Sequence, residues 1–265
     1  MTRLWAWASA AVIALVGPAA AQSVSAILEP SQIVEIMPAV PGRIGQEVLA
    51  EGTQVSRDTL LAQVDPNVQN ARVEVAQIVA NGDAAQERAN IVVEQAQTLV
   101  NRITRAKNKG AARAWEVTQA QQALALAQAD AKLAQENTRQ RAAQMKLEQA
   151  MLAEFDLRAP FDGTVLQVFI EPGEIVTTDT IAIEIGALER LHATAFVPLD
   201  WLEGLAQGDM LDAVLPNQNN TRVTALVRNI DPRIDPASQT VRVTLEVDNA
   251  DGAIFAGSVL QVSKP

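Results

Sequence analysis

Apolar residues recur every seven positions along the stretch from Pro66 to Leu152, which contains no internal proline. The first half of this stretch carries two such series, three residues apart. They are Val68, Val75, Gly82, Ala89, Ala96 and Ile103, and Ala71, Ile78, Ala85, Val92, Leu99 and Ala106. Glu, Gln, Arg and Asn occupy most of the positions between them. Two apolar series with this spacing and polar surroundings predict the seam of a coiled-coil helix.

A second repeat begins after Gly110, which lies midway along the same stretch. One series is Val117, Leu124, Ala131, Thr138, Met145 and Leu152, and its companion is Ala120, Ala127 and Ala134 before it fails at Arg141 and Glu148. We therefore predict two helices of nearly equal length over residues 66–154, folded into a long antiparallel coiled-coil hairpin. Each arm would extend roughly 60 Å at about 1.5 Å per residue. The alternative is the core of a helical bundle, which requires further amphipathic helices that the rest of the chain does not supply.

Short β-like segments with turn residues lie on both sides of the hairpin, at residues 31–65 and 155–187. The two segments repeat each other at a constant offset of 121 residues, so that Gly42 corresponds to Gly163 and Gly52 to Gly173. Gly52 and Gly173 suit tight turns that need a positive φ. Neither copy is long enough to close a core. We therefore predict that the copies pair face to face as one split β-sandwich with the hairpin inserted between them.

Alternating strands return after Gly186, at residues 191–198, 210–215, 222–230, 240–247 and 258–262. A short helix is predicted at residues 199–205, and turn residues punctuate the strands. This pattern suits a small β-barrel, to which we assign residues 22–30 and 188–265.

Two half-motifs of the biotinyl/lipoyl type, split by a helical hairpin, resemble the membrane fusion proteins, the HlyD-like family of periplasmic adaptors. These adaptors serve tripartite efflux pumps and type I secretion systems. Residues 160–165 (Pro-Phe-Asp-Gly-Thr-Val) are similar to the strand with which that family re-enters its sandwich. Residues 229–242 and 249–258 resemble the adaptor barrel in the order of their turn residues. The resemblance covers essentially the whole chain after residue 21 and implies an α+β, elongated and modular fold.

A lipoyl-type fold ordinarily carries its cofactor on a lysine between its two halves. Here no lysine precedes Lys107, and none lies between Phe155 and Ala187. Because amide attachment of biotin or lipoate requires a lysine amine, we expect no cofactor and a purely structural sandwich.

Residues 1–21 have the pattern of a secretory signal peptide. Arg3 is the only charge, an apolar run follows from Leu4 to Val16, and small residues precede Gln22, where we expect cleavage. The run is short for a bilayer span, although an uncleaved anchor is the alternative. No later segment has eighteen consecutive apolar residues, so we expect the exported, mature chain to be soluble in the periplasm.

The composition argues against several classes of function. The chain has 21 Lys and Arg against 31 Asp and Glu, a net charge of −10 and 3% aromatic residues, which argues against a nucleic-acid partner. It has no cysteine, and its single histidine, His192, lies between strand-like residues. We therefore predict no Ser-His-Asp set, no phosphate loop, no metal site and no enzyme activity. The methionines, which bind copper in some metal-efflux adaptors, are scattered.

A basic cluster marks the predicted tip of the hairpin, where no Asp or Glu occurs from Thr98 to Trp115. Its members are Arg102, Arg105, Lys107, Lys109 and Arg113. Our hypothesis is an electrostatic dock for an acidic rim on a partner channel, and the alternative is a solvated turn. Trp115 belongs either to this tip or to the helical seam.

The resemblance implies an adaptor associated with the inner membrane of a Gram-negative bacterium. It would link an inner-membrane transporter of the resistance–nodulation–division (RND) type to a TolC-like outer-membrane channel. It would also form a homo-oligomer, either a hexamer or a trimer of dimers. Service to an ABC-type exporter and a scaffolding role in the cell envelope without a transporter remain the alternatives. The exported substrate is not specified by the sequence.

Two departures from the family pattern bear on the partners. Many RND adaptors have a membrane-proximal domain built from strands at both chain ends, and we expect that domain to be absent here. Adaptors that dock end-on to a TolC-like channel often carry Arg, Leu and Ser around the tip. Only Arg102 matches that set, because Ala106 and Arg113 occupy the other two positions.

Overall fold

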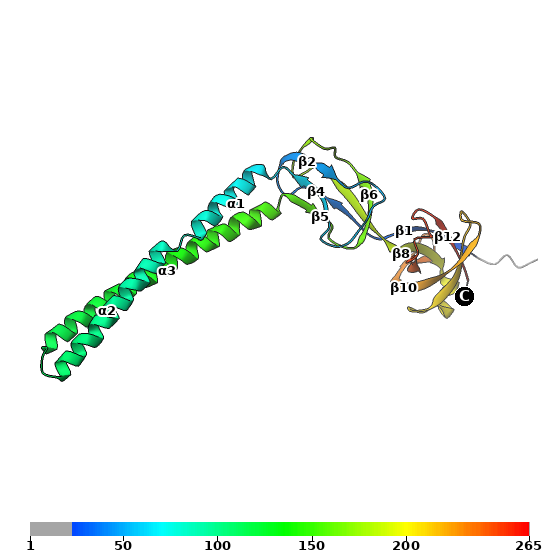
Figure 1. The fold of residues 1–265 in the computed structure, drawn as a ribbon. Helices are drawn as coiled ribbons and strands as arrows, with labels where there is room; N and C mark the ends of the chain where they lie inside the picture. Colours follow the sequence, from blue (N-terminus) through cyan, green and yellow to red (C-terminus); the bar gives the residue numbers. More distant parts are fainter. Residues whose placement is uncertain (1–22, 265) are drawn as a thin grey trace, which may run out of the picture. The chain divides into compact units, whose positions relative to one another are not determined.

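The computed structural model describes residues 23–264, which form two compact units (Figure 1). One unit is residues 33–186 and holds the three α-helices. The other combines residues up to 32 with residues from 187 onward. Strands β1 (Ser23–Ile36) and β8 (Ile183–Pro198) each contribute residues to both units, so the chain passes from one unit to the other along these strands. The predicted signal peptide, residues 1–21, lies outside the described residues.

The helical hairpin consists of α1 (Asn67–Ala80), α2 (Ala84–Asn108) and α3 (Ala114–Ala153), with α1 and α2 both packed along α3 (Figure 1). The prediction of two helices of nearly equal length was wrong for the first arm, which is interrupted at residues 81–83. Asn, Gly and Asp are weak helix formers, and Asp83 stands at the N-cap of α2 without a side-chain capping bond. These local preferences outweigh the seven-residue repeat, which has Gly82 at this point. Within the described residues, no helix has the length and apolar character that a membrane crossing requires.

The contact between the two arms follows the predicted repeat on α3. On the first arm it includes the predicted positions Ala89, Ala96 and Ile103, but it departs from the predicted repeat before Ala89. On α3 every predicted position is buried or half-buried, and the repeat continues through Arg141 and Glu148. We call these positions and their counterparts on the first arm seam residues. On the first arm they are Gln69, Val73, Ala76, Ala80, Gln86, Ala89, Val93, Ala96, Val100 and Ile103. Val68, Val75 and Ile78, which the sequence placed on the seam, are 71%, 61% and 68% exposed. The first arm therefore has a second apolar stripe that α3 does not cover.

The sandwich is built by reciprocal pairing between its two halves. The first half holds β2 (Gly42–Val48), β3 (Gln54–Val55) and β4 (Leu60–Val64), and the second holds β5 (Asp156–Arg158), β6 (Gly163–Val168) and β7 (Ile175–Val176). Strand β2 pairs with β7 in the register Gly42↔Val176, and β3 pairs with β6 in the register Val55↔Gly163. The offset of 121 residues maps one pairing onto the other, because each half lends its short strand to the other half. Neither half completes its sheet alone, as the repeat predicted.

The turns and the core of the sandwich repeat in the same way. Gly52 and Gly173 have φ values of +79° and +87°, as the sequence predicted for these turns. The Gly52 N–H donates to the Val165 carbonyl at 2.8 Å, and the Gly173 N–H donates to the Ile44 carbonyl at 3.0 Å. The core combines corresponding residues of both copies, which are Ile44 and Val165, Val55 and Val176, Leu61 and Ala182, Ala62 and Ile183, and Val64 and Ile185.

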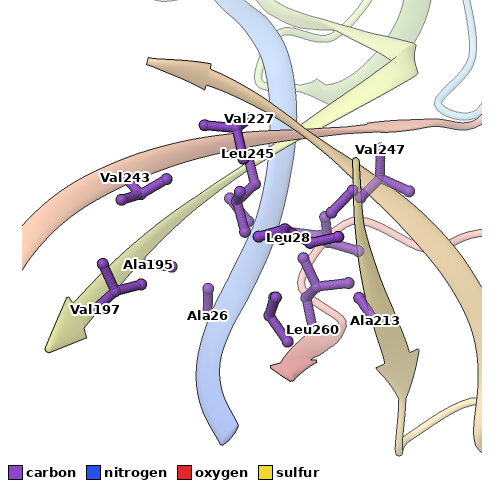
Figure 2. Close-up of a cluster of buried hydrophobic side chains, with 14 of the residues drawn as sticks. Ala26, Leu28, Ala195, Val197, Ala213, Val227, Val243, Leu245, Val247 and Leu260 are labelled. Carbon is purple, nitrogen blue, oxygen red and sulfur yellow. The ribbon is translucent and has the colours of Figure 1, made fainter. Parts of the chain in front are cut away.

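The second unit is a closed β-barrel. Its strands follow the order β1, β12 (Val259–Ser263), β9 (Met210–Leu215), β10 (Thr221–Asp235), β11 (Thr240–Asp248) and β8, and pairing of β1 with β8 completes the ring. Closure removes the free edges that open sheets expose. A 3₁₀ helix, η1 (Leu199–Gly204), stands where the sequence predicted a short helix. The interior is filled by small and branched side chains such as Leu28, Leu245 and Leu260 (Figure 2). The chain is therefore an α+β protein in which a helical hairpin interrupts a sandwich, as predicted.

Candidate partner-docking surface

The turn of the hairpin, between α2 and α3, is set by Gly110. Its φ is +76°, in the left-handed region that side chains with a Cβ atom enter only with strain. The Ala111 N–H donates to the Ala106 carbonyl at 2.9 Å, and the Gly110 N–H donates to the Lys107 carbonyl at 2.9 Å. This pair of bonds is a Schellman motif, which satisfies the last carbonyls of a helix. The prediction that the chain reverses at Gly110 is confirmed.

The start of α3 is held by a carboxylate. Arg113 is extended, with φ −90° and ψ 157°, and its N–H donates to Oε2 of Glu116 at 2.6 Å. The Glu116 N–H in turn donates to the Arg113 carbonyl at 3.2 Å. A negative charge in the first turn also interacts favourably with the helix dipole. Glu116 therefore has a structural role immediately beyond the stretch that the sequence marked as free of acids.

All five basic residues predicted at the tip are exposed. Arg102, Arg105 and Lys107 lie on the last two turns of α2, Lys109 follows this helix, and Arg113 precedes α3. Over residues 23–264, none of the five takes part in an ion pair. The structure thus brings all five to one end of the helix pair, with their charges open to solvent. Their role in docking stays a prediction.

One aromatic side chain accompanies these cations. Trp115, on the first turn of α3, is 58% exposed, so it belongs to the tip surface and not to the seam. Below it, Val100 and Val117 are both only 9% exposed and form the end of the seam. The tip therefore presents cations and one indole on a closed helix pair, a combination that can attract an acidic surface and contact it through apolar area.

The opposite end of the hairpin has a polar seam that sequence reasoning missed. Gln69 is 4% exposed, and its Nε2 donates to the Glu148 carboxylate and to the Glu148 carbonyl, each at 3.0 Å. Arg141 donates to the Val79 carbonyl at 3.4 Å, near the end of α1. The signal was present in the sequence, because Arg141 and Glu148 continue the repeat of Ala120, Ala127 and Ala134. Arg141 and Glu148 therefore belong to the seam and form its polar part.

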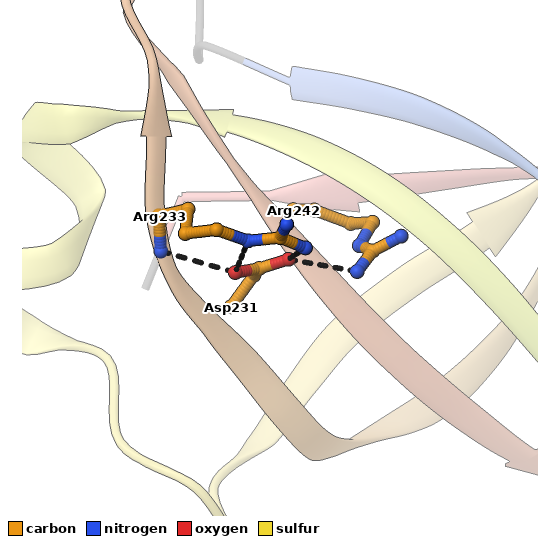
Figure 3. Close-up of polar contacts among 3 residues, drawn as sticks. All are labelled: Asp231, Arg233 and Arg242. Atoms are coloured by element: carbon orange, nitrogen blue, oxygen red, sulfur yellow. Dashed lines mark hydrogen bonds and ion pairs between the residues drawn. The ribbon is translucent and has the colours of Figure 1, made fainter.

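The Asp231 carboxylate of the barrel accepts hydrogen bonds from two arginines (Figure 3). Asp231 lies on β10, where the register with β11 shifts between Ile230 and Ile234. Its oxygens accept from the backbone N, Nε and Nη2 of Arg233 at 3.0, 3.0 and 2.9 Å, and from Nη2 of Arg242 at 2.7 Å. The hydrogen bonds from Arg233, followed by its charge and the bond from Arg242, hold the pKa of the Asp231 carboxyl well below its usual range. Asp231 therefore fixes the irregular part of β10.

The single histidine belongs to another polar cluster on the barrel. His192 Nε2 lies 3.3 Å from Oε2 of Glu246, and Arg228 Nε lies 2.8 Å from the same oxygen. These residues come from β8, β11 and β10, so the cluster joins three neighbouring strands. Within residues 23–264, no group of three or more His, Asp or Glu side chains is arranged to hold a metal ion.

Two family profiles match the chain. The profile described as "RND MFP, barrel-sandwich hybrid domain" matches residues 32–185. The profile described as "CusB-like, beta-barrel domain" matches residues 193–264. The first match covers the sandwich together with the inserted helices, and the second covers most of the barrel.

Two curated relatives are similar to the chain at low sequence identity. The chain is 25% identical to the nodulation protein NolF of Rhizobium meliloti (strain 1021) over 243 residues, which are 84% of this chain and 64% of NolF. It is 27% identical to the cation efflux system protein CusB of Escherichia coli (strain K12) over 111 residues, which are 41% of this chain and 27% of CusB. The chain therefore spans less than two thirds of the length of these relatives.

Among solved structures, the chain is similar to the crystal structure of MacA from Actinobacillus actinomycetemcomitans. The TM-score is 0.74 at 18% sequence identity, and the match covers 92% of this chain and 78% of MacA. At this identity the likeness concerns the fold alone, and its coverage extends over nearly the whole chain.

Proposed function

The chain belongs to the membrane fusion protein family of RND systems, and from this premise we propose that it is a periplasmic adaptor subunit of a tripartite efflux pump. In this role it links an inner-membrane RND transporter to a TolC-like outer-membrane channel and catalyses no reaction. The observation that carries the proposal is the helical hairpin inserted between two interlocked halves of one sandwich.

The base of the hairpin supports a role in mechanical connection. The strand before α1, β4, pairs with the strand after α3, β5, in the register Gln63↔Asp156. Gln63 Nε2 donates to the Asp156 carboxylate at 2.6 Å, and the Val64 N–H donates to the Phe155 carbonyl at 2.8 Å. Both arms therefore leave the sandwich from adjacent, hydrogen-bonded strands. Such a base transmits a displacement of the sandwich to the helices better than two flexible linkers would.

The tip supports contact with a channel. Five exposed cations, with no acid among them before Glu116, favour the approach of an acidic rim and raise the association rate at low ionic strength. In this proposal the tip engages the outer-membrane channel, and the barrel engages the inner-membrane transporter.

The proposal also includes location and assembly. The leader predicted at residues 1–21 directs the chain to the periplasm of a Gram-negative bacterium, where it associates with the inner membrane. Identical copies form a hexamer or a trimer of dimers, since a contact that repeats with a closing rotation gives a ring. The ring encloses the path of the exported compound.

Photo-crosslinking in intact cells tests the proposal. One variant carries the crosslinking residue at Lys109 on the tip, and another carries it at Phe255, which is 74% exposed on the barrel. We expect Lys109 to capture an outer-membrane channel and Phe255 to capture an RND transporter. A variant labelled at Ala129, in the middle of α3, is the control and should capture neither. Capture of an ABC-type exporter at Phe255 would replace the RND transporter, and capture of no membrane protein at either site would refute the adaptor role.

A further inference from the structure

One side of the hairpin is a groove between α1 and α3 with a volume of about 890 Å³. Its lining includes Val68, Val75 and Val79 on α1 and Asn137, Gln140 and Gln144 on α3. Each of these residues immediately precedes a seam residue. Because the seam repeats every seven positions, residues that precede seam residues lie on this same side along the whole hairpin. We call them the groove flank.

The other side of the hairpin is occupied by the residues that immediately follow seam residues, which we call the opposite flank. A second hollow, of about 610 Å³, is lined there by Asn90, Gln128, Lys132, Gln135 and Arg139. Each of these follows a seam residue on α2 or α3. The two hollows thus identify the two flanks independently of the repeat.

The two flanks differ in polarity. The groove flank carries an apolar stripe whose side chains are between 46% and 71% exposed, namely Val68, Val75, Val79, Val92, Leu126, Leu133 and Leu147. The opposite flank of the three helices carries no large apolar side chain, and its exposed residues include the amides Asn90, Gln97, Gln121, Gln128, Gln135 and Gln149. Exposed apolar side chains that are concentrated on one side of a protein surface mark a contact with another molecule.

The charges of the flanks identify that molecule. On the first arm the groove flank is basic, with Arg72, Arg88 and Arg102, and the opposite flank is acidic, with Glu74, Glu87 and Glu94. On α3 the signs are reversed: the groove flank has Glu116 and Asp130, and the opposite flank has Lys132, Arg139 and Lys146. No charged flank residue of the three helices departs from this rule. Each arm is therefore complementary to the same arm of an identical hairpin placed beside it.

We infer that the groove flank of one hairpin packs against the opposite flank of a second copy that points the same way. Arg88 then lies at the level of Glu87 of the second copy, and Asp130 lies at the level of its Lys132. These levels differ by one or two residues, or roughly 1.5–3 Å along a helix. The apolar stripe is covered by the methylene groups of the glutamines. Because both flanks of every copy are used, the contact repeats from copy to copy and is of the kind that closes into rings.

This inference rests on the homo-oligomeric part of the proposed function. It excludes a two-fold pairing of groove flank with groove flank, which would place Arg88 against Asp130 of the second copy. That pairing would leave the six charges of the opposite flank without partners. The two arrangements make opposite predictions for one and the same variant.

Charge reversal on single flanks of the purified chain tests the contact. The groove variant is R88E/D130K, the opposite-flank variant is E87K/K132E, and the control is Q122E/A129E/E136K, whose residues are exposed on α3 and lie on neither flank. All three leave the net charge unchanged. By sedimentation velocity at low salt, we expect each flank variant to self-associate about tenfold more weakly than wild type, and the control to match wild type. An equimolar mixture of the two flank variants should regain wild-type association, because each reversed flank then meets its complement on the other chain.

Restoration of association by mixing distinguishes a lost contact between chains from misfolding, because mixing does not change the sequence of either variant. A groove variant that associates as wild type would overturn the inference and indicate groove-to-groove pairing, in which R88E and D130K remain complementary. A mixture no better than its components would also overturn it, as would a wild-type chain that stays monomeric at the highest attainable concentration. Neither transporter nor channel is needed for this experiment, so its failure is distinct from failure of the crosslinking that tests the adaptor role.

Discussion

Replacement of Gly163 by alanine should strongly destabilise the sandwich. Gly163 begins β6, which lies between β3 and β8. A Cβ atom at this position would lie 2.7 Å from the Gly186 carbonyl oxygen and 3.2 Å from Cγ2 of Ile185. The carbonyl belongs to the backbone of β8, and Ile185 is fully buried, so neither group can rotate away. The alanine must therefore push β6 and β8 apart.

The cost follows from what the new methyl group meets. Overpacking of a tight interior costs about 1–3 kcal/mol, and we expect Gly163→Ala near 3 kcal/mol because backbone is displaced. Gly186→Ala is the matched control, since its Cβ atom would lie 2.6 Å from Cδ1 of Leu166, an equally short contact. Leu166 is only half-buried and its side chain can change rotamer, so this variant should lose about 1 kcal/mol. Gly173→Ala meets no atom within 4 Å but has φ +87°, which costs about 1–2 kcal/mol of strain.

Hydrogen exchange followed by mass spectrometry measures these differences, because peptides from β4 and β6, which lie in the sandwich alone, report its opening separately from the barrel. The expected order of loss is Gly163→Ala first, then Gly173→Ala, then Gly186→Ala. If Gly186→Ala cost as much as Gly163→Ala, the distinction between a fixed carbonyl and a mobile leucine would be refuted. A loss near 3 kcal/mol would also lower the amount of folded protein in the cell.

Three further predictions concern the tip, the barrel and the end of α1. Replacing Arg105, Lys107 and Lys109 by Glu should slow binding to the purified channel by roughly tenfold at low salt and little at high salt, and unchanged association kinetics would contradict the proposed dock. Asp231→Asn should lower the urea midpoint of the barrel at pH 7. Because folding lowers the pKa of Asp231, its charge stabilises the wild-type barrel above about pH 3.8, and this stabilisation decreases at lower pH. The difference in urea midpoint between wild type and Asp231→Asn should therefore be smaller at pH 3 than at pH 7. A larger difference at pH 3 would contradict this reasoning. Arg141→Ala should speed hydrogen exchange at the end of α1, by an amount equivalent to about 1 kcal/mol, and unchanged exchange would contradict the cap at Val79.

Features that depend on local conformation could be predicted from the sequence. Gly110 could be predicted as the turn because it lies midway between two seven-residue repeats, and the structure gives it the positive φ that glycine adopts without strain. Gly52 and Gly173 were identified in the same way. The repeat at an offset of 121 residues also predicted that two incomplete halves share one core, because each half has too little apolar surface to close by itself.

Features that depend on a choice between similar alternatives could not be predicted. The first arm has apolar residues on two stripes, and periodicity alone gives both of them equal weight. Contact with α3 selects the stripe through Val93 and Val100, which leaves Val68 and Val75 exposed. The interruption at residues 81–83 has the same origin, since weak local helix formers compete there with the repeat.

Some of the candidate docking residues could be predicted from the sequence, and others could not. The five cations of the tip were named from charge and spacing, because a cluster between two helical repeats must lie where the chain reverses. The complementary charges of the flanks were equally present in the sequence. They could not be sorted until the seam was known, because a shift of one residue moves each of them to another side of its helix.

The turn residues, the periodicity of α3 and the pairing of two half-sandwiches could thus be predicted from the chain alone, since they follow from backbone preference and from the amount of apolar surface in each segment. Four features depend on the folded structure instead: which stripe of the first arm faces α3, where that arm breaks, how the barrel closes and which arginines hold Asp231. These are outcomes of packing, in which several local solutions of nearly equal free energy are separated only by contacts between residues far apart in the chain.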